Sequence, residues 1–197
     1  MKKLLIMLIL LISNVCFSQV NIETIRNKNK DKSIWGEVKG GLELQRGNVD
    51  ITAFDTDILI HIKKEKHHVF LKGQTTQGKQ SDKQFKNYSF GHIRWTWMYW
   101  EKIGCEIFSQ IQHDEFKALK VRQLNGGGLR SELFNFEDFV LSFGSGVMHD
   151  HEKLLTGPEA SNIRSTSYLS MIKSFDKKKK NLILLTVYYQ PLLNNHK

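Results

Sequence analysis

A strict alternation of apolar and polar residues is the feature that most constrains this chain. Between residues 34 and 45, apolar and small residues occupy every second position, and mostly charged, amide or indole side chains lie between them. A period of two is typical of a β-strand with one apolar and one polar face, because successive side chains point to opposite sides. The apolar and small set is Ile34, Gly36, Val38, Gly40, Leu42 and Leu44.

The alternation returns along the rest of the chain. Ile58, Ile60 and Ile62 form the next apolar face, with Asp57 and His61 on the opposite face. The turn-like stretch Gly47 to Asp50 separates the first two segments, which predicts a hairpin. We predict nine strands and no helix, at residues 34–45, 54–63, 67–77, 85–97, 103–113, 119–133, 139–148, 165–175 and 181–190.

The lengths of these segments favour an antiparallel, up-and-down transmembrane β-barrel. Tilted strands need about 9–11 residues to cross a bilayer, whereas strands of globular proteins average about 5–6. The predicted connections also alternate in length: those at 64–66, 98–102, 135–138 and 176–180 are short or compact, and those at 78–84, 114–118 and 149–164 include the longest. Outer-membrane barrels alternate short periplasmic turns with longer extracellular loops, so we place the N-terminus and the short turns in the periplasm. The short link at 46–50 is an exception.

Four aromatic residues cluster where the fourth predicted strand meets a short turn. Membrane-interface girdles of Trp and Tyr are expected at such a place. A cluster in the core of a soluble domain is the alternative reading. The residues are Trp95, Trp97, Tyr99 and Trp100.

The start of the chain has the pattern of an export signal. Two lysines precede an apolar run and then small residues, so we predict a signal peptide at residues 1–18, cleaved before Gln19. Residues 19–33 are polar and predict a flexible periplasmic lead-in, and residues 34–197 predict the barrel domain. Cys16 lacks the residues that precede a lipidated cysteine, and Cys105 alone would remain after cleavage, which excludes an internal disulfide. We expect the protein in the outer membrane of a Gram-negative bacterium.

Nine strands are awkward for such a barrel, because bacterial single-chain barrels have even strand numbers and leave no edge facing lipid. The final residues, 191–197, are loop-like and carry no terminal aromatic residue. We therefore expect about ten strands in the complete protein, with the last one missing from this chain.

The overall charge and hydropathy exclude few classes. The formal charge is +9, which falls to +7 when Lys2 and Lys3 leave with the signal peptide (9 − 2 = 7). The basic residues are scattered, and the run from Lys177 to Lys180 is expected in a solvated hairpin turn, so we expect lipid and not nucleic acid as the partner. The mean hydropathy of −0.38 and the absence of a long apolar run after the first twenty residues exclude a bundle of membrane-spanning helices.

Three short motifs resemble a known family. Residues 47–52 (GNVDIT), 112–116 (QHDEF) and 124–130 (LNGGGLR) are similar to the hairpin, turn and glycine-rich strand of the YdiY-like putative salt-induced outer-membrane proteins, a domain of unknown function. The resemblance covers about residues 35–148. His113 and Asn125 depart from the usual pattern of that family. What the resemblance implies is an outer-membrane β-barrel without an established activity.

The densest polar group is His149-Asp150-His151-Glu152. Imidazole and carboxylate groups can bind Zn²⁺ or Mn²⁺, and His149 and His151 would share one face of a strand, so they are candidate metal ligands. Solvation in a long loop is the reading we favour, and we expect no cofactor.

A rim-located hydrolase is a second reading of the same region. His113 and Asp114 lie at the same predicted rim as His149 and Asp150, as Asp and His do in outer-membrane proteases of the omptin type. The four are candidate catalytic residues, but no motif supports them, and we predict that the protein is not an enzyme.

The polar faces carry charges of both signs, including Glu37, Asp57, Lys72 and Glu106. Such charges usually pair and fill a narrow barrel. The leading hypothesis is thus a small outer-membrane barrel that serves envelope structure, stress response or narrow-solute passage. A secreted soluble barrel that binds a small apolar ligand on an inward apolar face is the alternative, and the hydrolase is third.

Overall fold

The computed structural model describes residues 33–81, 83–175 and 181–194. The predicted signal peptide, nearly all of the predicted lead-in and the run from Lys177 to Lys180 lie outside the described residues. Within the described ranges there is one short 3₁₀ helix, η1 (Glu115–Lys117), and no helix there is long and apolar enough to cross a membrane.

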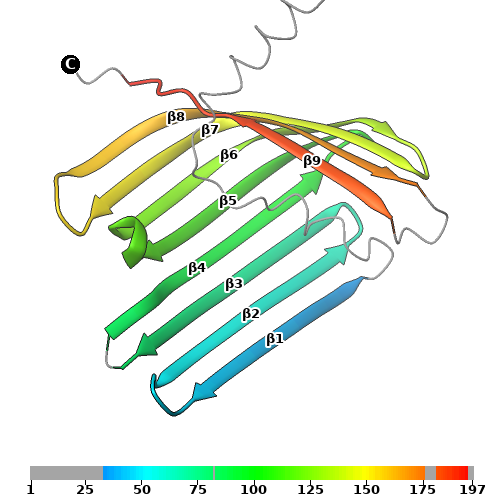
Figure 1. Ribbon diagram of the computed structural model, residues 1–197. Coiled ribbons are helices and arrows are strands. Elements are labelled where there is room, and N and C mark those ends of the chain that lie inside the picture. The colour runs from blue at the N-terminus through cyan, green and yellow to red at the C-terminus, as the bar shows by residue number, and fades with distance from the viewer. Residues whose placement is uncertain (1–32, 82, 176–180, 195–197) are drawn as a thin grey trace, which may run out of the picture.

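Within these described ranges, nine strands form a single sheet in chain order, and each strand is antiparallel to the next (Figure 1). Every predicted strand is confirmed, and the all-β, up-and-down fold class is confirmed with them. The strands are β1 (Ile34–Gln45), β2 (Ile51–Lys64), β3 (His67–Gln80), β4 (Lys83–Met98), β5 (Ile103–Asp114), β6 (Leu119–Asn135), β7 (Phe139–Leu154), β8 (Glu159–Ser174) and β9 (Leu182–Tyr189).

The predicted alternation of short and long connections is wrong. Residues 149–164, expected as the longest loop, belong mostly to β7 and β8, which leaves only a turn at 155–158. Residues 78–84 are likewise mostly strand. The polar composition of these stretches was misleading because both of their faces are polar. A strand of that kind has no apolar alternation to separate it from a loop.

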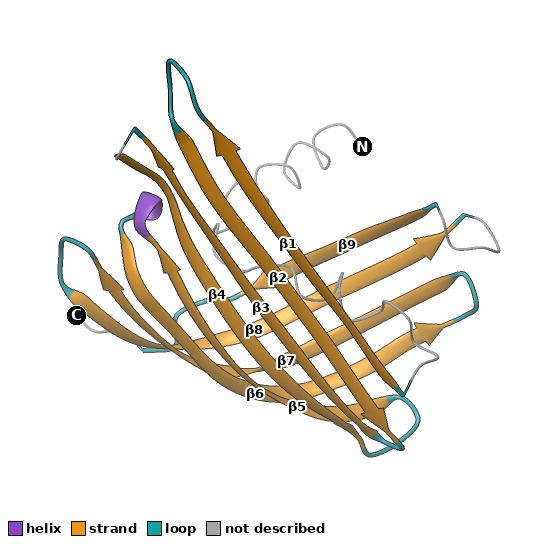
Figure 2. Ribbon diagram, turned by 90° about the horizontal axis from the view of Figure 1, so that it is seen from below, coloured by secondary structure: helices purple, strands orange, loops and turns teal. Residues whose placement is uncertain are grey.

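The sheet is strongly curved and has two rims, which we name by one turn in each. The β1–β2 rim holds the turns at 46–50, 115–118 and 155–158 and the link between β3 and β4, and the β2–β3 rim holds those at 65–66, 99–102 and 136–138 and the link between β8 and β9. Figure 2 shows the strands wrapping into a trough, with β1 and β9 as its edges. The trough has a concave and a convex face.

The concave face is identified by contacts between strands that are not neighbours. The hydroxyl of Tyr168 on β8 lies 2.9 Å from a carboxylate oxygen of Glu106 on β5, although β6 and β7 lie between these strands. Only the inner side of a curved sheet brings such residues together. The pairing register then assigns to this face the residues that alternate with Glu106 and Tyr168 along each strand.

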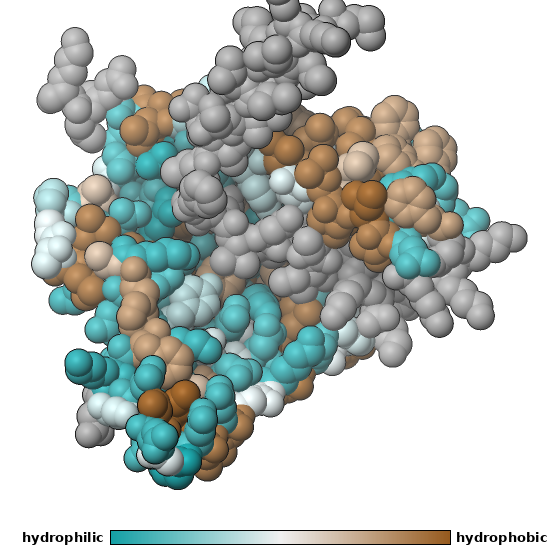
Figure 3. Space-filling model, in the orientation of Figure 1, coloured by the Kyte–Doolittle hydropathy of each residue, from teal (hydrophilic) through white to brown (hydrophobic). Residues whose placement is uncertain are grey.

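The concave face is mainly polar and buried, and the convex face carries the apolar residues. On β5 the inward Glu106, Gln110 and Gln112 are buried, while the outward Ile107 and Ile111 are 55% and 50% exposed. A soluble protein has the opposite arrangement. Polar residues gather in the hollow of the trough in Figure 3. The apolar core is correspondingly small: Leu59 and Phe70 form one buried cluster, with Trp35 packed against it.

Glycines allow β6 and β7 to come close where the sheet bends. A Cβ atom on Gly128 would lie 2.3 Å from the carbonyl oxygen of Ser145, and one on Gly146 would lie 2.2 Å from that of Gly127. The ring of Tyr168 covers Gly144, so that a Cβ there would lie 2.2 Å from the ring. The glycine-rich run therefore serves close strand packing, as glycine in a strand often does.

Candidate polar interior

The four candidate catalytic residues lie on two different faces of the sheet. Asp114 and Asp150 are buried on the concave face, at 7% and 2% exposure. His113 and His149 precede them by one residue in the same strands and therefore point to the convex face. The ring of His113 contacts the backbone carbonyl of Lys120 at 2.8 Å. The sheet thus separates the imidazoles from the carboxylates, and no His–Asp arrangement of the expected kind is assembled from these four.

The candidate metal ligands His149 and His151 do share the convex face. Their rings are stacked with centroids 6.5 Å apart. His149 Nε2 lies 2.7 Å from Ser161 Oγ, and His151 Nε2 lies 3.0 Å from a carboxylate oxygen of Glu159. Among the residues that the structure describes, no group of three His, Cys, Asp or Glu side chains is placed to hold a metal ion.

Asp114 has a structural role at the end of β5. It is the N-cap of η1, and its carboxylate accepts a hydrogen bond from the backbone N–H of Lys117 at 3.3 Å. The ammonium group of Lys117 lies 3.2 Å from the other carboxylate oxygen. Capping satisfies a donor that the short helix leaves open.

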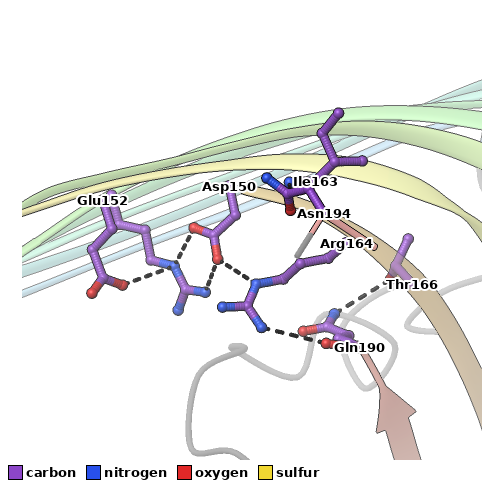
Figure 4. A network of polar contacts seen from close by, with 8 residues as sticks. Asp150, Glu152, Ile163, Arg164, Thr166, Gln190 and Asn194 are labelled. Carbon is purple, nitrogen blue, oxygen red and sulfur yellow. Dashed lines mark hydrogen bonds and ion pairs between the residues drawn. The ribbon is translucent and has the colours of Figure 1, made fainter. Parts of the chain in front are cut away.

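Asp150 is the centre of the first of two ionic networks on the concave face (Figure 4). Arg122 donates two hydrogen bonds to its carboxylate, at 2.9 and 2.6 Å, and Arg164 donates a third at 2.9 Å. Glu152 lies 3.5 Å from Arg122. A planar guanidinium suits such two-point pairing with a carboxylate. Arg164 also reaches the backbone carbonyl of Gln190 at 3.4 Å, which links β6, β7 and β8 to the segment after β9.

Glu106 is the centre of the second network. Its carboxylate accepts hydrogen bonds from Arg94 at 3.2 Å, from Thr96 at 3.3 Å and from the hydroxyl of Tyr168 at 2.9 Å. Arg130 donates to the Tyr168 oxygen at 2.8 Å and to Ser142 at 2.9 Å. All of these residues are at most 7% exposed. The network therefore joins five consecutive strands, β4 to β8, across the hollow.

Histidine and aromatic rings continue the polar interior toward β2. His61 Nδ1 and His68 Nε2 share a hydrogen bond of 3.0 Å, and the His61 ring packs on Phe70 with centroids 5.0 Å apart. His92 lies against the other side of Phe70, at 5.8 Å, and contacts the side-chain oxygen of Gln110 at 3.2 Å. The interior of this half is thus a row of rings packed against one another at tilted angles, with polar edges.

An open cavity of about 260 Å³ adjoins the second network at the β2–β3 rim. Thr96 and Arg130 line it together with Lys63, Lys66 and Glu132. It is smaller than typical ligand pockets of about 300–1,000 Å³. Its charged lining suits a small polar solute more than an apolar one.

The sequence predicted the acidic members of these networks better than the basic ones. Glu106 follows from the polar face of its strand, and Asp150 was a candidate catalytic residue. The arginines did not enter the predicted site, although Arg122 and Arg130 occupy the same alternating positions in β6. Their partners could not be predicted, because pairing across several strands depends on the curvature of the sheet.

These features define the class of protein: a single up-and-down antiparallel sheet whose concave face is polar and ion-paired and whose convex face is apolar. A family model described as a protein of unknown function, DUF481, matches residues 38–183, and the chain belongs to this family. The match agrees with the resemblance to YdiY-like proteins found in the sequence. Neither a curated protein nor a solved structure matches the chain.

Proposed function

We propose that this protein is an outer-membrane β-barrel whose polar interior is narrowed by ion pairs, so that it contributes to the structure of the envelope and passes only small polar solutes. One observation carries the proposal: the face that encloses the interior is polar, and the outward face is apolar. Exposed apolar side chains occur on every strand of the sheet, for example Val38 at 74% and Leu169 at 44% exposure. Soluble monomers rarely expose a continuous apolar surface of this extent.

The polar interior also separates this proposal from a soluble barrel with an apolar ligand. Such a barrel needs its apolar residues on the enclosed face. Here that face holds Glu106, Asp150 and the arginines that pair with them. The bilayer is the apolar partner that the convex face fits.

Closure of the proposed barrel requires one more strand. Because neighbouring strands are antiparallel, β1 and β9 run in the same direction. Antiparallel pairing with both edges is satisfied by a tenth strand between them, which would remove both edges from lipid. Ten strands agree with the even numbers of bacterial single-chain barrels.

Cell fractionation tests the membrane location. We expect the full-length protein in the outer-membrane fraction, resistant to extraction with carbonate. We also expect its mobility on a gel to change when the sample is heated, because a folded barrel resists the detergent until heating. Recovery in the soluble periplasm together with a mobility that heat does not change would contradict the location.

Liposome swelling tests the narrowed interior. We expect vesicles that contain the protein to exclude sugars, because the two ionic networks fill the centre of the concave face. The double variant Arg122→Ala, Asp150→Ala removes both sides of one network and should admit a monosaccharide. Rapid swelling of vesicles with the unchanged protein would show a wide pore. If vesicles swell neither with the unchanged protein nor with the double variant, the barrier to the sugar lies outside this network.

A further inference from the structure

The convex face is not apolar over its whole height. On β5 to β8, the half nearer the β1–β2 rim carries outward hydrogen-bonding side chains that form one continuous surface, which we name the convex polar patch. Ser109 donates to the side-chain oxygen of Asn125 at 2.8 Å, and His149 contacts Ser161 at 2.7 Å. The patch consists of Ser109, Gln123, Asn125, His149, His151 and Ser161.

The pairing register relates the patch to the apolar part of the same face. Ile60 on β2 pairs with Leu71, and Leu71 pairs with Ile93 on β4. The same row continues through Ser109 and Asn125 to His149 on β7, so it passes from apolar to polar residues. On β8 the row reaches Ile163, which is 50% exposed. Most other exposed apolar residues of the later strands, such as Leu129, Phe143 and Leu169, lie closer to the β2–β3 rim.

The apolar part of the convex face is displaced along the strands from the register row that begins at Ile60. The displacement is four residues on β6, from Asn125 to Leu129, and six on β8, from Ile163 to Leu169. Strand tilt explains it. A row of paired residues runs perpendicular to the strands, whereas the membrane plane crosses tilted strands obliquely. With strands about 4.8 Å apart and tilted by about 40°, the membrane plane therefore moves along each successive strand by about one residue relative to that row. This amounts to roughly two residues from β4 to β6 and four or five from β4 to β8, in the same direction as the displacements of four and six residues and somewhat smaller. The apolar band is therefore level in the membrane, and the patch stands above it.

We propose that the convex polar patch projects beyond the hydrocarbon layer and lies among the polar, phosphate-bearing headgroups of the leaflet at the β1–β2 rim. This inference rests on the proposed membrane location. Hydroxyl, amide and imidazole groups can donate to phosphate oxygens. Lys153, two residues after His151 on the same strand, is ion-paired with Glu159 at 2.9 Å, so the neutral donors of the patch carry the argument. Exposed Ile111 and Ile163 at the margin of the patch suit the mixed chemistry of an interface more than open water.

Spin labels on single cysteines test the depth. In a Cys105→Ser background, Asn125→Cys and Ser161→Cys place labels in the patch, and Leu129→Cys and Leu169→Cys are matched controls on the same strands. The protein is reconstituted in phosphatidylcholine and phosphatidylglycerol vesicles that contain a lipid with nickel chelated at its headgroup. We expect the headgroup nickel to relax the patch labels several-fold more than the controls, and dissolved oxygen to relax the controls more.

Each other outcome has a separate meaning. Patch labels that respond to oxygen and not to nickel would place the patch in hydrocarbon, which overturns this inference and leaves the membrane location intact. Patch labels relaxed by a water-soluble nickel chelate and not by the lipid-bound nickel would place the patch in open water, which also overturns it. If all four labels respond equally to the soluble chelate, the protein is not inserted and the proposed function fails first.

Discussion

At the scale of residues, the buried carboxylates decide how well the concave face is held together. Asp150 accepts hydrogen bonds from two arginines on different strands and is 2% exposed. Charges removed from water are costly unless they are paired, and an unpaired buried charge costs more than the pair itself contributes. The stability of the fold should therefore fall more when one partner of the network is removed than when all partners are replaced by apolar residues.

Asp150→Ala should lower the free energy of unfolding by about 3–5 kcal/mol, because it leaves the guanidiniums of Arg122 and Arg164 without their carboxylate. Urea unfolding of the reconstituted protein measures the change. Adding Arg122→Met to Asp150→Ala should recover part of the loss, since one unpaired charge is removed. A loss in Asp150→Ala no larger than that in the exposed control Lys153→Gln would contradict the structural role of the network.

An exposed ion pair between Asp138 in a turn and Lys173 predicts that the stability of the fold depends on pH. The hydrogen bond from Lys173 holds the pKa of Asp138 below its ordinary value. A lowered pKa in the folded state means that the stabilisation is present above the unfolded pKa of about 4 and is lost as the pH falls through the folded value. The pair is exposed, so the effect is small.

Unfolding of the unchanged protein and of Asp138→Asn should therefore differ at neutral pH and converge in acid. The measurement is the unfolding midpoint of both proteins between neutral and strongly acidic pH. A difference that grows as the pH falls would have the wrong sign for this pair.

At the scale of elements, each long strand presents different chemistry to its two sides and along its length. β7 and β8 were predicted too short because their ends near the β1–β2 rim are polar on both faces: Asp150 and Arg164 point inward, and His149 and Ser161 point outward. Alternation detects a strand only where the two faces differ in polarity. The central parts of the nine strands that the structure describes meet this condition, so the sequence was enough to predict the order and number of these strands.

An arginine on the convex face should cost stability according to its depth. Leu169 lies in the apolar band between Phe143 and Val187 of the neighbouring strands. We expect Leu169→Arg to lower the free energy of unfolding in a bilayer by about 2–4 kcal/mol. His149→Arg, in the convex polar patch, should cost less than about 1 kcal/mol. Unfolding in vesicles measures both. Equal costs at the two positions would argue against a level apolar band.

At the scale of the whole molecule, the sequence predicted the sheet and missed its interior connections. Period-two patterns gave the strands and the polar face that includes Glu106 and Lys72. The contact between Tyr168 and Glu106 depends on the curvature that brings β8 over β5, and the glycines that allow this curvature carry no periodic signal. The candidate His–Asp site failed to assemble for a local reason, since neighbouring residues of a strand cannot share a face.

The central claim is that the convex face lies against lipid and the concave face encloses a polar interior. Trp97 is on the convex side of β4, and Trp35 is on the concave side of β1, where it packs against His61. Two variants, one with Trp97 and one with Trp35 as the sole tryptophan of the chain, can be reconstituted in vesicles with brominated acyl chains. The bromine atoms quench the fluorescence of an indole that touches the acyl chains. The account predicts strong quenching of Trp97 and little quenching of Trp35. Stronger quenching of Trp35 than of Trp97 would contradict it.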